Sequence, residues 1–131
     1  MITGFEEITE PLTETEETVF LPPIIKGLRL KIGRHNAVTN KDIVRGLKKN
    51  LGINISEARV RKIINHIRNN DLVPCLIATS KGYYIAETQQ EVDDYIDSLN
   101  GRLDAISAVA KSMSRQRQMR WPSPLSLFPN L

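Results

Sequence analysis

Apolar residues recur at helical intervals through most of this chain, with polar residues between them. In residues 40–51, four aliphatic side chains fall one, three and four positions apart, on one side of a helix: Ile43, Val44, Leu47 and Leu51. Thr39 precedes them as a helix N-cap, with Asp42 three residues on. Gly52 follows, where helices commonly end. The pattern predicts a helix over residues 40–51.

The stretch SEARVRKIINHIRNN, residues 56–70, predicts a helix with two different sides. After Ser56 as N-cap, a buried stripe is expected from aliphatic residues at intervals of three, one and three: Val60, Ile63, Ile64 and Ile67. Beyond Glu57 in the first turn, the polar residues of the other side and its flanks are all cations, amides or histidine: Arg59, Arg61, Lys62, Asn65, His66, Arg68 and Asn69. A merely solvated helix face usually mixes charge signs, whereas cations and amides pair with phosphates and base edges. We therefore weigh a nucleic-acid contact against plain soluble surface.

An earlier helix is expected to begin at Glu14. Thr13 and Glu16 have the spacing of a capping box, and acidic residues in a first turn suit the helix dipole. Pro22 and Pro23 each lack a backbone N–H, so they should kink or restart this helix. The expected pieces are about residues 14–21 and 23–32, ended by the Gly33 to Asn36 segment.

Two β-rich runs, residues 75–79 and 83–86, flank Ser80-Lys81-Gly82 and predict a hairpin with a lysine at its tip. A shorter β-leaning segment lies at residues 37–39. Cys75 is expected to be a small apolar filler in the first strand rather than a nucleophile. Of Tyr83 and Tyr84, one should be core and the other surface.

The region after the hairpin carries a heptad pattern. Apolar residues alternate at intervals of four and three: Val92, Ile96, Leu99, Leu103, Ile106, Ala110 and Met113. Two arrangements fit this seam: pairing with a second copy in a coiled-coil dimer, or packing against the preceding domain as an extra core helix. We favour the dimer. Asn100-Gly101 could still divide the helix in two.

The last residues, 116–131, have little periodicity and three prolines, which predicts a flexible tail. Four of its side chains are large and apolar: Trp121, Leu125, Leu127 and Phe128. Two interpretations stay open: a peptide that docks on a protein partner or a second subunit, or a loose terminus.

Composition limits the choice of class. The chain has 131 residues, is 40% hydrophobic and only 5% aromatic, which suits one modest domain with an Ile, Leu and Val core. No apolar run is long enough to span a membrane, and the first residues lack the features of a secretory signal. The single cysteine excludes an internal disulfide and fits a reducing compartment. We therefore expect a cytoplasmic protein.

Charge is segregated along the chain. Residues 1–21 carry a net charge of −6, residues 22–88 carry +9, residues 89–110 carry −4 and the remainder carries +4. A basic middle segment attracts polyanions, of which nucleic acid is the commonest in the cytosol. The acidic first segment could cover the basic surface and compete with DNA for it. That competition is a hypothesis.

The order of elements from Pro23 to Glu87 resembles that of winged helix-turn-helix DNA-binding proteins. The segment IINHIRNNDLVPCLIATSKGYYIAE is also similar to small winged-helix proteins of phage and prophage gene sets. The resemblance implies a mainly α fold with a small β-hairpin (α+β), a winged helix-turn-helix followed by a long C-terminal helix. The link from Leu51 to Ser56 is longer than in the tightest form of the motif.

The resemblance also implies roles for residues. Residues 57–69 would be the recognition helix in the major groove, Lys48 and Lys49 would hold the DNA backbone, and Lys81 would touch DNA from the wing tip. The DNA-binding residues expected are Arg59, Arg61, Lys62, Asn65, His66, Asn69, Lys48, Lys49 and Lys81. Two-fold pairing through the heptad helix would add affinity and set the half-site spacing.

Four segments follow: an acidic N-terminal segment (1–13), the winged-helix domain (14–87), a C-terminal helix (88–115) and the tail (116–131). No motif in the sequence indicates an enzyme, a metal site or a cofactor. The expected function is double-stranded DNA binding, as a homodimeric transcription regulator or replication accessory of a phage or mobile element. The alternative is a protein-interaction adaptor that uses the winged-helix scaffold without binding DNA.

Overall fold

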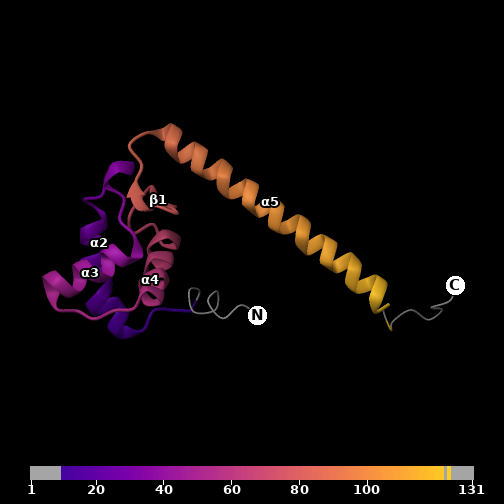
Figure 1. The fold of residues 1–131 in the computed structure, drawn as a ribbon, viewed down its shortest axis with the longest axis horizontal. Coiled ribbons are helices and arrows are strands. Elements are labelled where there is room, and N and C mark those ends of the chain that lie inside the picture. The colour runs from indigo at the N-terminus through magenta and orange to yellow at the C-terminus, as the bar shows by residue number, and fades with distance from the viewer. Residues whose placement is uncertain (1–9, 123, 125–131) are drawn as a thin grey trace. The chain divides into compact units, whose positions relative to one another are not determined.

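The described part of the chain folds into four longer helical stretches, a short 3-10 helix and one β-hairpin, as expected for an α+β protein with a long C-terminal helix (Figure 1). The computed structural model describes residues 10–122 and residue 124. These residues divide into two compact units between Val92 and Asp93. We call them the N-terminal unit and the C-terminal unit.

The first helical stretch begins at Glu14 and runs to Leu28 without a break. It contains a π-helical turn, η1 (Glu16–Phe20), followed directly by α2 (Leu21–Leu28). In the π turn, the backbone N–H of Leu21 donates to the carbonyl oxygen of Glu16, five residues back. Pro22 and Pro23 directly follow Leu21 inside this continuous stretch, and neither has a backbone N–H to donate. The prolines therefore alter the helix geometry rather than interrupt the helix.

The predicted extension of this helix to residue 32 is wrong. Ile32 instead forms a β-bridge with Ile85. The N–H of Ile85 donates to the Lys31 carbonyl at 2.7 Å, and the N–H of Gly33 donates to the Ile85 carbonyl at 2.9 Å. These hydrogen bonds to a distant strand take the backbone groups that a longer helix would need. A short 3-10 helix, η2 (Arg34–Asn36), follows.

The next two helices have the predicted bounds and caps. α3 (Asn40–Leu51) begins with a complete capping box between Thr39 and Asp42, and ends at Gly52 in the left-handed conformation. α4 (Glu57–Asn69) is capped by the Ser56 side chain, which accepts a hydrogen bond from the N–H of Arg59. α3 and α4 pack against each other (Figure 1). Both predictions are confirmed, because the caps and the apolar stripes are local features of the sequence.

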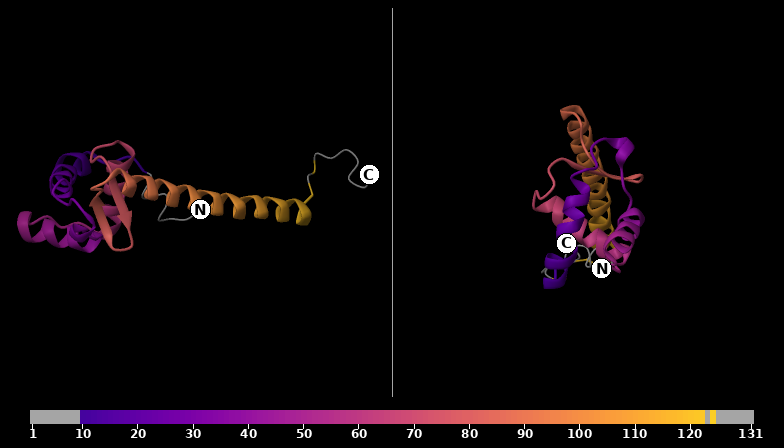
Figure 2. Two further views of the ribbon diagram at one scale, coloured as in Figure 1. Left: turned by 90° about the horizontal axis from the view of Figure 1, so that it is seen from above. Right: turned by 90° about the vertical axis from the view of Figure 1, so that its left-hand side faces the viewer.

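The hairpin consists of β1 (Leu76–Thr79) and β2 (Gly82–Ile85), which run antiparallel in Figure 2. Val38, in the β-leaning segment, adds an antiparallel bridge to Tyr83. Tyr84 is buried, whereas Tyr83 is half-buried and donates its hydroxyl to Asn40 Oδ1 at 2.8 Å. The sheet therefore joins the segment before α3 to the segment after α4.

Cys75 is not a strand residue and not a core filler, so that prediction is wrong. It is exposed, and its φ of 60° is in the left-handed region. It lies in the turn that reverses the chain before β1, where backbone geometry rather than apolar pattern decides which way a side chain points.

The core of the N-terminal unit lies between the helices and the hairpin. The four aliphatic residues predicted as the inner stripe of α4 are all buried, at no more than 2% exposure. They form one cluster with side chains of η1, α2, α3, the α4–β1 turn and β1: Phe20, Ile24, Leu28, Leu47, Val73 and Leu76. α4 is therefore fixed on its inner side by contacts from every neighbouring element.

The C-terminal unit consists mainly of α5 (Gln89–Arg120), whose first residues belong to the N-terminal unit. The helix passes through Asn100-Gly101 without interruption, so the suspected break is wrong, and it ends five residues beyond the predicted boundary at 115. None of its 32 described residues is buried. Trp121 is exposed, with the Arg120 guanidinium 5.0 Å from its ring centroid. Leu125, Leu127 and Phe128 lie outside the described residues.

Among the described helices, none combines the length and the apolar character that crossing a membrane requires.

Gly82, at the start of β2, provides a test of the sheet. Its φ is 122°, and an added Cβ would lie 2.5 Å from the carbonyl oxygen of Val38. We expect Gly82→Ala to lower the free energy of unfolding by about 1–3 kcal/mol, because backbone atoms cannot yield as a flexible side chain can. Urea unfolding measures this change.

Gly46→Ala is the matched control, because an added Cβ in the middle of α3 meets nothing within 4 Å. It should stabilise the protein by about 0.5–1 kcal/mol through helix propensity. Equal effects of the two substitutions would contradict the close approach of Val38 to Gly82.

Candidate nucleic-acid interface

The outward side of α4 is divided into a covered part and an open part. At the open part, Arg61 and Asn69 are exposed, while Asn65 and Arg68 are half-buried and make contacts of their own. The covered part carries Arg59 and Lys62, on the side that faces the first helical stretch. The division follows from one residue of that stretch, Glu16.

Glu16 is a buried carboxylate that binds two cations of α4. Its Oε1 accepts a hydrogen bond from Lys62 Nζ at 2.7 Å, and its Oε2 accepts one from Arg59 Nε at 3.1 Å. Only 2% of the Glu16 surface is exposed. We call these three residues the Glu16 cluster. A buried charge needs such partners, because unpaired it would lose its hydration without compensation.

The same carboxylate completes the capping box that the sequence predicted. The N–H of Thr13 donates to Glu16 Oε1 at 2.9 Å, and the Thr13 hydroxyl accepts from the N–H of Glu16 at 3.2 Å. Glu16 therefore caps its own helix and joins that helix to α4. One side chain has both a local and a long-range role.

The hydrogen bonds of the cluster determine the ionisation of Glu16. Burial acts to raise its pKa, but hydrogen bonds from Lys62, from the backbone of Thr13 and from Arg59 outweigh burial. The pKa falls from an ordinary value of 4.5 to about 2. Glu16 is consequently a permanent negative charge at neutral pH.

The expectation that Arg59 and Lys62 are free cations on the outward face is wrong. The Lys62 side chain is only 12% exposed, and that of Arg59 is 41% exposed. The Arg59 guanidinium also lies 5.0 Å from the centroid of the Phe20 ring. The helix α4 has no carboxylate of its own on this side. The fold brings Glu16 there, which is 43 residues before Arg59 and 46 residues before Lys62 in the sequence. The acidic residues 1–21 thus contribute one carboxylate, that of Glu16, to the basic side of α4.

The remaining predicted residues come from three elements. Lys48 and Lys49 are exposed in the last turn of α3, and Lys81 is exposed in the turn of the hairpin. His66 is half-buried on α4 and lies 3.4 Å from the Asn70 side chain, measured from Nδ1 to Nδ2. The cations of α3 and the hairpin are accessible to an anionic partner, whereas His66 lies against Asn70, the residue that follows α4.

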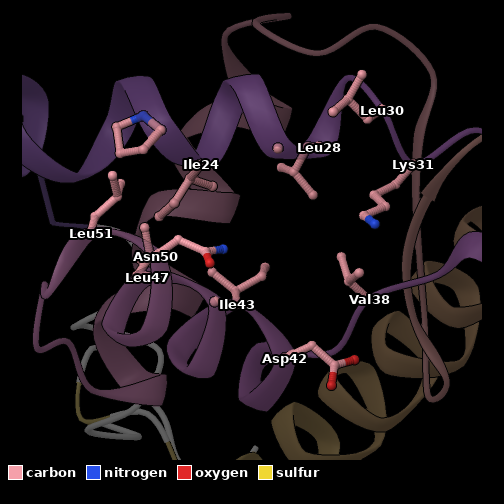
Figure 3. Close-up of a pocket in the computed structure, with 13 residues that line it drawn as sticks. Ile24, Leu28, Leu30, Lys31, Val38, Asp42, Ile43, Leu47, Asn50 and Leu51 are labelled. Carbon is pink, nitrogen blue, oxygen red and sulfur yellow. The ribbon is translucent and has the colours of Figure 1, made fainter.

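An apolar groove between α2 and α3 has no counterpart in the sequence predictions. Its volume is about 460 Å³. Figure 3 shows Ile24 and Leu28 from α2 facing Ile43 and Leu47 from α3, with further lining from Val38, Leu30, Leu51, Lys31, Asp42 and Asn50. Gly27 and Gly46 also line the groove, and an added Cβ at either position would meet no atom within 4 Å. Its polar residues are few, as in surfaces that bind apolar groups.

Acid should reveal the contribution of Glu16 to stability. Because its pKa is lower in the folded chain than in the unfolded chain, ionised Glu16 stabilises the fold above about pH 4.5. This contribution, of order 3 kcal/mol, is lost as the pH falls from 4.5 toward 2. We expect Glu16→Gln to flatten the pH dependence of the unfolding free energy, measured in urea between neutral pH and about pH 3.

Glu17→Gln is the control for this measurement, because Glu17 is an exposed neighbour outside the Glu16 cluster. It should keep the acid-dependent loss of stability. A Glu16→Gln variant with the wild-type slope would show that the cluster contributes nothing to stability.

No group of three or more His, Cys, Asp or Glu side chains within residues 10–122 and 124 is arranged to hold a metal ion. Comparisons with protein-family models, curated proteins and solved structures find no match for the chain. The evidence on function is therefore the arrangement of the exposed cations of α3, α4 and the hairpin turn.

Proposed function

We propose that the N-terminal unit is a winged helix-turn-helix that binds double-stranded DNA through the open part of α4. The order of elements supports this: a helix, a bridging segment, two packed helices and a hairpin. Val38, between α2 and α3, bridges to the hairpin, as the first strand of a winged helix does. The observation that carries the proposal is the exposed Arg61, on a helix whose opposite side is fully buried.

The residues assigned to DNA differ from those expected from sequence. Arg61 and Asn69, both exposed, are proposed to face base edges or the adjacent sugar-phosphate. The exposed lysines Lys48, Lys49 and Lys81 are proposed to contact phosphates. Arg59, Lys62, Asn65 and His66 are secondary, because each already has a contact within the chain.

The proposed biological role is that of a transcription regulator or replication accessory of a phage or mobile element. It rests on the resemblance of the sequence to small phage winged-helix proteins. The role implies residence in the compartment that contains the DNA. We also propose that the protein is a homodimer paired through the seam of α5, where every apolar side chain except Val92 is exposed in the single chain.

A protein-interaction adaptor is the second candidate. The groove between α2 and α3 favours it, since an apolar groove of about 460 Å³ can accept aliphatic side chains of a partner helix. The two functions predict different behaviour toward nucleic acid. The adaptor does not bind duplex DNA even at low salt.

A fluorescence anisotropy titration on random duplex tests the proposal. We expect micromolar binding at low salt, with an affinity that falls steeply as salt rises, because each phosphate contact releases condensed counterions. Arg61→Glu should weaken binding by about tenfold or more and reduce the salt slope by about one or two units.

Lys26→Glu is the matched control, because Lys26 is exposed on α2 and the substitution changes the net charge equally. It should change affinity much less. No binding by the wild type at low salt would favour the adaptor, and equal losses from both substitutions would show that α4 is not the contact face.

Glu16 provides a separate test of competition within the chain. If its carboxylate holds Arg59 and Lys62 away from DNA, Glu16→Gln should bind duplex several-fold more tightly at low salt, provided that circular dichroism shows it folded. Glu17→Gln removes the same charge from an exposed site and sets the reference. Equal affinities for the two variants would remove Glu16 as a competitor.

A further inference from the structure

The helix α5 presents an apolar stripe of mostly exposed side chains. Ile96, Leu103 and Ile106 are 47%, 62% and 67% exposed. They belong to the seam with Val92, Leu99, Ala110 and Met113, at intervals of four and three along a single unbroken helix. A stripe of this length on a soluble helix normally faces another helix.

Charge is divided unequally between the two halves of α5. The first 16 residues, 89–104, carry five carboxylates and Arg102, a net charge of −4. The last 16 residues, 105–120, carry four cations and no carboxylate, a net charge of +4. The acidic set is Glu91, Asp93, Asp94, Asp97 and Asp104, and the basic set is Lys111, Arg115, Arg117 and Arg120.

We propose that α5 pairs with α5 of a second copy in an antiparallel orientation. The inference rests on the homodimer proposed above and adds the direction of the two helices. In a parallel pair, the acidic halves lie side by side, and so do the basic halves. In an antiparallel pair, each acidic half lies along the basic half of the other copy. Opposite charges within about 10 Å attract, and like charges at that distance repel, at physiological ionic strength.

The seam itself accepts the antiparallel orientation. When two copies overlap over all of α5, Leu103 of one copy faces Ile106 of the other, Leu99 faces Ala110, and Ile96 faces Met113. All six layers formed by residues 96–113 are apolar, and Val92, the remaining seam residue, faces Arg117 of the other copy. Arg102 then lies beside the seam, opposite Val109 of the other copy. In a parallel pair it would lie opposite Arg102 of the other copy. Packing thus permits this register, and the charge halves favour its direction.

Label distances in the full chain distinguish the orientations. Cys75→Ser removes the one native cysteine, and Gln90→Cys or Gln118→Cys places a spin label near one end of α5. An antiparallel dimer should give a distance of roughly 40 Å or more between the two labels of Gln90→Cys, from a rise of about 1.5 Å per residue. A mixture of the two labelled variants should give a distance under about 25 Å, since paired helix axes lie about 10 Å apart.

These measurements test dimer formation and helix direction separately. Light scattering that reports a monomer would overturn the pairing itself. A dimer whose two residue-90 labels lie under about 25 Å apart would overturn the antiparallel direction alone. Neither measurement involves DNA, so the duplex titration judges the DNA-binding function independently.

A charge variant provides a second readout. Lys111→Glu with Arg115→Glu lowers the net charge of residues 105–120 from +4 to 0 and so removes the attraction to the acidic half of the other copy in an antiparallel pair. It should weaken the dimer about fivefold or more at low salt, with a smaller effect at high salt. In a parallel pair, the same change removes the repulsion between the two basic halves, because each falls from a net charge of +4 to 0, so the dissociation constant should fall rather than rise. Lys111→Arg with Arg115→Lys keeps both charges and is the control. An unchanged dissociation constant for the glutamate variant would contradict the antiparallel orientation.

Discussion

The buried carboxylate of Glu16 is the interaction on which the arrangement of the N-terminal unit depends. It accepts hydrogen bonds from the backbone of Thr13, from Lys62 and from Arg59, and so connects the start of the first helical stretch to the side of α4. A carboxylate with 2% exposure is stable only while these donors stay in place. The cluster therefore fixes the direction of α4 relative to the first helical stretch, in addition to the apolar core beneath it.

This interaction also determines which cations α4 can offer to a partner. The cations bound by Glu16 are held near the first helical stretch, while Arg61 remains exposed on the other flank of the helix. The proposed DNA contact is accordingly narrower than the sequence suggested, and it relies more on the lysines of α3 and the hairpin turn. A basic helix face is defined by the carboxylates that the fold brings to it as well as by its own residues.

The C-terminal unit, unlike the N-terminal unit, has no buried core among its described residues. Its helix has no buried residue, so the apolar seam lacks the packing that the core provides to α2, α3 and α4. The charges of α5 are sorted by position along the helix rather than mixed at intervals of four, which gives the helix a direction as well as a stripe. The exposed seam and the sorted charges are the two observations on which the proposed antiparallel pairing rests.

Local signals in the sequence determined the elements of this protein. Three features depend on residues within one or two turns: the caps at Thr39 and Ser56, the apolar stripes of α3 and α4, and the hairpin turn. The heptad seam repeats at regular intervals along one continuous helix. A single sequence therefore sufficed to predict these elements. Tertiary structure decided the rest. The first helical stretch ends at Leu28 because Lys31 and Gly33 bond to Ile85, and two of the predicted DNA contacts are bound to Glu16, more than 40 residues away. Periodicity reports which side of a helix is apolar, but it contains no information about which distant backbone or carboxylate will meet that helix.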